Sequence, residues 1–125
     1  IARDLKVRKI IKKKQISLVK KNRNKCVVEG RDSHLIFSKA FVKFYLKSNL
    51  KTASLRRFKE LKKKDMKISL KKITADLKKR DYSDTTRKHS PLIISKDHVV
   101  IRSDKNNKSQ MLKKMCEVIE SKMKK

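Results

Sequence analysis

The run FVKFYL at residues 41–46 decides the fold, together with the helix-forming stretch that follows it. β-branched and aromatic residues are enriched in strands, so we expect this run to form one. A helix is predicted over about 53–64, with Thr52 as its N-cap, because apolar residues there recur at helical spacing. These residues are Leu55, Phe58 and Leu61. A strand that leads directly into a helix is typical of the crossover connections of parallel sheets.

The chain continues with another helix, another strand and a last helix. Ser69 is expected to cap the second helix of this region, and the run HVVI at residues 98–101 is predicted to be a strand. Ser109 is expected to cap the last helix. The apolar residues predicted to face inward are Leu70, Ile73 and Leu77 in the first of these helices, and Leu112, Met115, Ile119 and Met123 in the second.

The first forty residues add one helix and one strand. Residues 4–20 carry a broad apolar face with lysines largely opposite, which predicts an amphipathic helix that Asn22-Arg23-Asn24 ends. The short apolar run Cys26-Val27-Val28 is typical of a buried strand, and Gly30 ends it. The predicted order is helix, strand, strand, helix, helix, strand, helix. Helices between strands favour an α/β fold with a partial parallel sheet flanked by helices.

Charge dominates the composition. The 125 residues hold 39 Lys and Arg against 12 Asp and Glu, a formal charge of +27, in a chain long enough for one domain at most. Such a charge favours polyanions, so nucleic acid is a candidate partner, while a genome-wide preference for lysine codons explains the same excess equally well. Cys26 and Cys116 lack metal-ligand spacing, and we expect both to be small buried residues. No apolar stretch is long enough to span a membrane, and no membrane partner is expected.

An arginine- and aspartate-rich string stands out from the lysine excess. The string reads RDYSDTTR from Arg80 to Arg87. A loop is predicted over residues 81–97, so most of the string lies in it, and the turn signal Ser90-Pro91-Leu92 follows within the same loop. Arginine forks suit phosphates, and carboxylates accept hydrogen bonds from ribose hydroxyls and exocyclic amines. Upstream, Gly30-Arg31-Asp32 follows the first predicted strand, at the sheet edge where open α/β sheets bind ligands. Together these strings predict a nucleotide site.

Several strings together resemble the bacterial cytidylate kinase family, P-loop NTPase-like nucleoside monophosphate kinases that phosphorylate CMP and dCMP with ATP. The matching strings are VVEGRD at 27–32, KFYL at 43–46, RRFKEL at 56–61, the Arg80 to Arg87 string and Ser90-Pro91-Leu92. Val7-Arg8, with Gln15 seven residues after Arg8, resembles the helix before the first of them. The strings follow the family's order, at close to its spacing, over almost the whole chain.

The resemblance implies a substrate-binding role for six residues. Arg8, Asp32 and Arg87 match positions that read the cytosine ring. The remaining three are Arg31, which matches a residue that holds the acceptor phosphate, and Arg80 and Asp84, which match residues that bind the sugar hydroxyls.

The resemblance also implies a lid over about residues 51–80. Arg56 and Arg57 lie in it and would neutralise charge on the transferred phosphoryl group. ATP and Mg²⁺ are the implied cofactors, and no residue of this chain is expected to bind the metal.

Each of these residues also has a purely structural interpretation. Arg56 and Arg57 on an exposed helix face are, without the family match, more often solvated charges than ligands. Arg80 can pair with an aspartate four residues away, a contact worth little at a surface. Asp32 can be a helix cap or a turn residue.

The sequence also departs from the family. No G-x-x-x-x-G-K-[ST] loop exists in a chain with a single glycine, and the runs 33–40 and Arg102-Ser103-Asp104 differ from the family's pattern. We expect the C-terminal half of a longer cytoplasmic enzyme, with the missing N-terminal half as its partner, and no phosphoryl transfer by these residues alone. The alternative hypothesis is a non-catalytic, basic RNA-associated protein derived from a kinase half domain.

Overall fold

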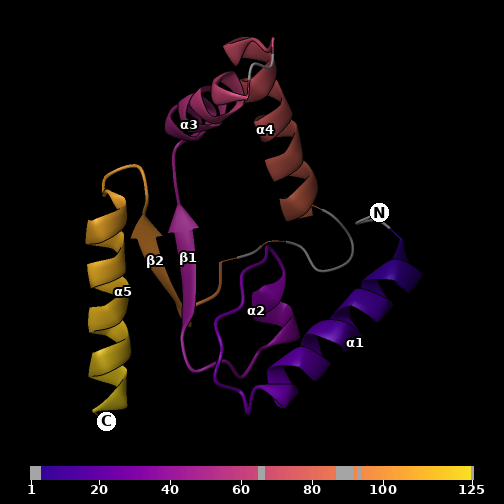
Figure 1. Cartoon of the computed structure of the whole chain (residues 1–125), viewed down its shortest axis with the longest axis vertical. Helices are drawn as coiled ribbons and strands as arrows, with labels where there is room; N and C mark the ends of the chain where they lie inside the picture. Colours follow the sequence, from indigo (N-terminus) through magenta and orange to yellow (C-terminus); the bar gives the residue numbers. More distant parts are fainter. Residues whose placement is uncertain (1–3, 65–66, 87–91, 93, 125) are drawn as a thin grey trace. The chain divides into compact units, whose positions relative to one another are not determined.

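The computed structural model describes residues 4–64, 67–86, 92 and 94–124. The chain divides into two compact units, which we call the N-terminal unit (Ile1–Ala40) and the C-terminal unit (Phe41–Lys125). Figure 1 labels the helices and strands of both units.

The N-terminal unit begins with the predicted amphipathic helix. Helix α1 spans Leu5–Lys21, and the Asp4 carboxylate caps it by accepting the backbone N–H of Lys6 at 2.9 Å. The predicted break is confirmed, because Arg23 and Asn24 have φ angles of 55° and 59°, in the left-handed region that ends a helix.

The strand predicted at Cys26-Val27-Val28 is wrong for this structure. These residues belong to no strand, and Val27 is 98% exposed. A short strand is stable only when a neighbour accepts and donates its backbone hydrogen bonds, and apolar character alone does not supply that neighbour. The segment leads instead into the short helix α2, Ser33–Ile36.

The C-terminal unit contains the predicted parallel sheet. Strand β1, Lys43–Lys47, pairs in parallel with β2, His98–Arg102, and the register runs from Lys43 opposite His98 to Lys47 opposite Arg102. The two arrows point the same way in Figure 1, and the chain between them forms α3 and α4. A small parallel sheet flanked by helices is therefore confirmed.

Helices α3 and α4 pack against each other within this connection. Helix α3 spans Leu50–Lys63, and its N-cap is Asn49, whose side-chain oxygen accepts the Thr52 N–H at 2.8 Å. The prediction of Thr52 as the cap is therefore wrong by one turn, because the helix begins earlier. Ser69 does cap α4, Leu70–Thr86, by accepting the Lys72 N–H at 3.2 Å.

The predicted loop over residues 81–97 is wrong in its first part. Helix α4 runs on through Thr86, because residues 80–86 contain no proline or glycine to stop it. The hydroxyls of Thr85 and Thr86 bond back to carbonyls one turn earlier, at 2.9 and 2.6 Å. Residues 87–91 and 93 of the predicted loop lie outside the described part of the chain.

The last helix, α5, spans Lys108–Met123 and contacts β2. Asn107 and Gln110 form a reciprocal capping box, so the prediction of Ser109 as the cap is wrong; Ser109 lies in the first turn. The predicted inner face is shifted as well, since Leu112 is 63% and Met123 71% exposed. The partly covered face consists of Met111, Met115, Val118 and Ile119.

Among the described residues of the C-terminal unit, the buried apolar ones are Leu61, Ile73 and Ile101, from α3, α4 and β2. The prediction that Cys26 and Cys116 are buried is wrong, because both thiols are exposed. An apolar run places a residue in a core only when another element covers it, and neither cysteine is covered in this way. No helix among the described residues is long and apolar enough to cross a membrane.

Candidate functional site

An ion pair joins two of the predicted site residues in the N-terminal unit. Arg8, in the first turns of α1, donates from Nη2 to Oδ2 of Asp32 at 3.0 Å. The side chains are only 16% and 29% exposed, so the pair is partly shielded from solvent screening. The structure thus brings together two residues 24 positions apart that the sequence resemblance predicts to read cytosine.

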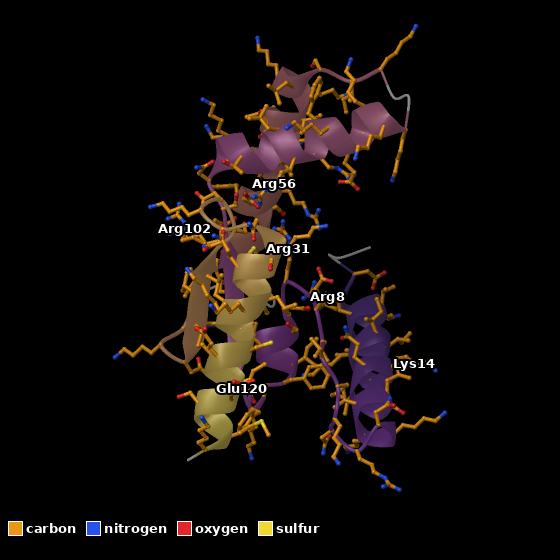
Figure 2. All side chains as sticks on the ribbon, turned by 60° about the vertical axis from the view of Figure 1, so that its left-hand side comes forward. Arg8, Lys14, Arg31, Arg56, Arg102 and Glu120 are labelled. Carbon is orange, nitrogen blue, oxygen red and sulfur yellow. The ribbon has the colours of Figure 1, made fainter. Side chains whose placement is uncertain are left out.

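Asp32 reaches this position through a tight turn. The Ser33 hydroxyl donates to the Gly30 carbonyl at 2.8 Å, and the Ser33 N–H donates to the same oxygen at 3.4 Å. Asp32 occupies the N-cap position of α2 without making a side-chain cap hydrogen bond, which leaves its carboxylate directed at Arg8. Arg31 is half-buried on the same turn, and Figure 2 labels it together with Arg8.

Arg80 and Asp84 lie one turn apart on α4 in the C-terminal unit. Arg80 Nε is 3.9 Å from Asp84 Oδ2, at the outer limit of an ion pair. The Asp84 side chain is 12% exposed, whereas that of Arg80 is 64% exposed. The backbone oxygen of Asp84 accepts the Leu92 N–H at 2.7 Å, which fixes the end of α4. Arg87, the third member of this string, lies outside the described residues.

The two arginines of the predicted lid are neighbours in sequence with different contacts. Arg57 Nη1 donates to Glu60 Oε2 at 3.0 Å, an exposed i,i+3 pair along α3. Arg56 points instead to the end of β2, where Nη2 donates to the Ser103 carbonyl at 2.5 Å and Nη1 to the Ser103 hydroxyl at 3.4 Å. Figure 2 labels Arg56 and Arg102 in this region.

A buried carboxylate that the sequence did not single out as a site residue lies beside them. Asp104 accepts two hydrogen bonds from Arg102, at 2.9 Å from Nε and 2.6 Å from Nη2, and its side chain is 3% exposed. The Arg102 hydrogen bonds hold the pKa of Asp104 well below its usual range, against desolvation, which raises it. The Arg-x-Asp spacing at the end of the strand is a signal that could have indicated this contact, although no prediction was drawn from it.

The described residues contain no group of three or more His, Cys, Asp or Glu side chains arranged to hold a metal ion.

A comparison with protein-family models assigns the chain to a family. The family model described as cytidylate kinase matches residues 1–121. The chain belongs to the cytidylate kinase family. The resemblance found in the sequence strings is therefore confirmed, and it covers both units.

Curated cytidylate kinases agree with this assignment. The chain is 34% identical over 94 residues to the cytidylate kinase of Clostridium botulinum (strain Loch Maree / Type A3), a match that covers 74% of this chain and 43% of that protein. It is 37% identical over 94 residues to that of Syntrophotalea carbinolica, covering 74% and 40%. It is 31% identical over 103 residues to that of Mycoplasmoides gallisepticum, covering 82% and 46%. The matched region is thus less than half the length of these curated relatives.

Proposed function

We propose that this chain is part of a nucleoside monophosphate kinase that transfers the γ-phosphoryl group of ATP to CMP or dCMP. The parent domain has the P-loop NTPase-type fold, works in the cytoplasm, and uses ATP and Mg²⁺. Family membership supports the kinase class. The observation that carries the substrate assignment is the Arg8–Asp32 pair, whose partners lie 3.0 Å apart.

The chemistry of this pair suits cytosine. Cytosine presents an exocyclic amine, which donates, next to a ring nitrogen and a carbonyl, which accept. In the proposed complex the Asp32 carboxylate accepts from the amine, while Arg8 and Arg87 donate to the acceptors. Uracil places a carbonyl where cytosine has the amine, so it would set an acceptor against the carboxylate. Discrimination against uracil then follows, because a site built for a donor rejects a ligand that lacks it.

The other predicted residues supply positioning and charge. Arg31 holds the acceptor phosphate, and Arg80 and Asp84 bind the sugar hydroxyls. Arg56 and Arg57 in the lid stabilise the charge on the transferred phosphoryl group. Phosphoryl transfer needs little covalent chemistry from the protein, so alignment of the two nucleotides and preorganised positive charge account for most of the rate.

These 125 residues alone are not expected to catalyse the transfer. They contain no P-loop motif, whose backbone amides and lysine cradle the ATP phosphates. The catalytic partner in this proposal is a P-loop segment, and phosphoryl transfer requires both.

The test is the binding of CMP and UMP to Asp32→Asn in the chain joined to a P-loop segment. We expect CMP to bind at least about tenfold more weakly, the cost of one charge-assisted hydrogen bond, and the preference over UMP to fall. Glu29→Gln is the matched control, because it removes an exposed carboxylate three residues away and changes the net charge equally. Equal effects of the two variants would contradict the assigned role of Asp32.

RNA binding is the second candidate function, and the charge of α1 favours it. Residues 5–21 carry eight Lys and Arg and no Asp or Glu. Phosphate contacts from such a helix release counterions, so RNA affinity would fall steeply with salt. It would survive Arg87→Ala and decline with each block of lysines removed. An RNA affinity that vanishes in Arg87→Ala would reject this alternative.

A further inference from the structure

The segment Arg102-Ser103-Asp104, which departs from the family's pattern, forms a set of contacts at the carboxyl ends of β1 and β2. We call it the strand-end cluster: Asn49, Arg56, Arg102, Ser103 and Asp104. Its members come from the end of β2, the loop after it, the N-cap of α3 and, for Arg56, the middle of α3. The Ser103 N–H donates to the Lys47 carbonyl at 2.8 Å, which continues the parallel pairing one residue beyond β2.

Asp104 is the centre of the cluster. Besides the two hydrogen bonds from Arg102, its Oδ2 accepts the Asn49 N–H at 3.3 Å. Asn49 is the N-cap of α3, so one carboxylate ties the loop after β2 to the residue from which the lid helix begins. The Arg102 carbonyl also accepts from Asn106 Nδ2 at 2.6 Å, which closes the loop on itself. The position of Ser103 between Arg102 and Asp104 is thereby held from both sides.

Ser103 in turn orients Arg56. The guanidinium donates to the Ser103 carbonyl and hydroxyl through its two terminal nitrogens, Nη2 and Nη1. A guanidinium has five N–H donors in a rigid fork, so donors remain for a second partner once these two are engaged. A fork held in this way loses less conformational freedom when it binds a phosphate.

The charges separate Arg56 from its neighbours. Glu60 accepts from Arg57, and Asp104 accepts from Arg102, so both of those guanidinium charges have a carboxylate partner. Among the contacts of the described residues, those of Arg56 are with a carbonyl and a hydroxyl, which leave its positive charge uncompensated. Open α/β sheets bind their ligands at the carboxyl ends of the strands, where this charge lies.

We propose that Asp104 is a positioning residue for Arg56: through Arg102, Ser103 and Asn49 it holds the Arg56 guanidinium at the strand ends, ready to bind a polyphosphate. This inference rests on the proposed function in assigning phosphate binding to the lid, and it deepens that assignment by naming Arg56, and not Arg57, as the preorganised arginine. Asp104 itself does not touch the phosphate.

The experiment measures binding of inorganic tripolyphosphate to the 125-residue chain, with the Arg56 Nε–H signal followed by NMR so that binding at this place is distinguished from binding to lysines elsewhere. Asp104→Asn removes one negative charge, and this change in net charge by itself strengthens anion binding. We nevertheless expect the affinity reported by Arg56 to fall about tenfold, because the fork loses its fixed orientation. Asp76→Asn is the control with the same charge change on an exposed carboxylate of α4, and it should not weaken binding.

A double-mutant cycle tests whether Asp104 acts through Arg56. Arg56→Lys keeps the charge and removes the fork, so adding Asp104→Asn to it should cost little more. Arg57→Lys combined with Asp104→Asn should give additive losses. If Asp104→Asn behaves like Asp76→Asn, or if its effect adds fully to that of Arg56→Lys, the proposal is overturned.

Two further arms keep the outcome decisive. If Asp104→Asn does not fold, Arg102→Lys replaces it, because this variant keeps the charge and loses the bidentate contact. We expect the tripolyphosphate affinity reported by Arg56 to fall again, by less than in Asp104→Asn. An unchanged affinity overturns the proposal. CMP is not a component of this assay. Failure of the cytosine assignment therefore leaves the coupling between Asp104 and Arg56 intact, and a failed cycle leaves CMP binding at Asp32 unaffected.

Discussion

The two ends of the parallel sheet carry the same kind of contact in different surroundings. At the amino end, Lys43 on β1 pairs with Asp97, just before β2, at 2.5 Å, but the Asp97 side chain is 56% exposed. At the carboxyl end, Asp104 is 3% exposed and is also hydrogen-bonded to the residue that caps α3. The first contact joins the adjacent amino ends of the two strands. The second connects the sheet to a third element, helix α3, through Asn49. The two ends therefore differ in the number of elements that the contact joins more than in the ion pair itself.

The largest effect is expected between the two ends, at Ile101. This residue of β2 is 4% exposed, so its truncation would leave a cavity in the core beside the sheet. Ile101→Ala should lower the free energy of unfolding by about 2–5 kcal/mol, the usual cost of a cavity in a core. Val100→Ala, at a neighbouring position that is 46% exposed, is the control. Chemical denaturation of both variants measures the difference, and similar losses would show that β2 has no buried face.

The carboxyl end should respond to substitution more strongly than the amino end. Asp104→Asn changes a carboxylate that is 3% exposed and weakens its contacts with both Arg102 and the Asn49 N–H, whereas Asp97→Asn changes a carboxylate that is 56% exposed and within reach of water. We therefore expect the larger fall in thermal midpoint for Asp104→Asn. Hydrogen exchange should speed up at the first turn of α3 in that variant alone. Faster exchange in α3 of Asp97→Asn would erase the distinction between the ends.

Both ends should make stability depend on acid. Hydrogen bonds from Arg102 to Asp104, and from Lys43 and Ser95 to Asp97, hold the pKa of each carboxyl well below its usual range. Because the folded pKa lies below the unfolded value of about 3.9, each pair contributes stability above about pH 4 that is lost as the pH falls further. The free energy of unfolding should therefore fall less between pH 6 and lower pH in Asp104→Asn and in Asp97→Asn than in the unmodified chain. A variant with the same acid dependence as the unmodified chain would show that its carboxyl is not shifted.

Salt should have the smallest effect, and only at the amino end. Exposed ion pairs are screened by added salt, while buried ones are screened much less. The difference in thermal midpoint between the unmodified chain and Asp97→Asn should therefore shrink as salt is added. The corresponding difference for Asp104→Asn should persist. If both differences shrink together, the carboxyl end is more exposed to solvent than its contacts indicate.

Prediction from the sequence succeeded where the signal is local. The α1 boundaries, the Ser69 cap and both strands of the parallel sheet follow from spacing, side-chain chemistry and strand propensity. The caps Thr52 and Ser109 were wrong, because several polar residues near a helix start compete and only backbone geometry selects Asn49 and Asn107. The 26–28 strand failed for a different reason, since no local pattern reports whether a pairing partner is present.

The candidate site shows the same difference between what the sequence predicts and what only the structure shows. Family strings in the sequence named Arg8, Asp32, Arg80 and Asp84, and the structure joins the first two and the last two as pairs. Their roles toward CMP stay predictions, and Arg87 lies outside the described residues. The different surroundings of Arg56 and Arg57 were not visible in the sequence, because adjacent residues on a helix point in directions about 100° apart.

The sequence by itself determined the kinase family, the parallel crossover and the excess of positive charge, because each is written in residue types and their spacing. Only the tertiary structure decided which carboxylate faces which guanidinium. Arg102 and Asp104 are two residues apart, yet their bidentate contact matters because it meets Asn49, 55 positions away. Such a contact depends on the strand register and the loop path together, and neither is encoded in any single stretch of the chain.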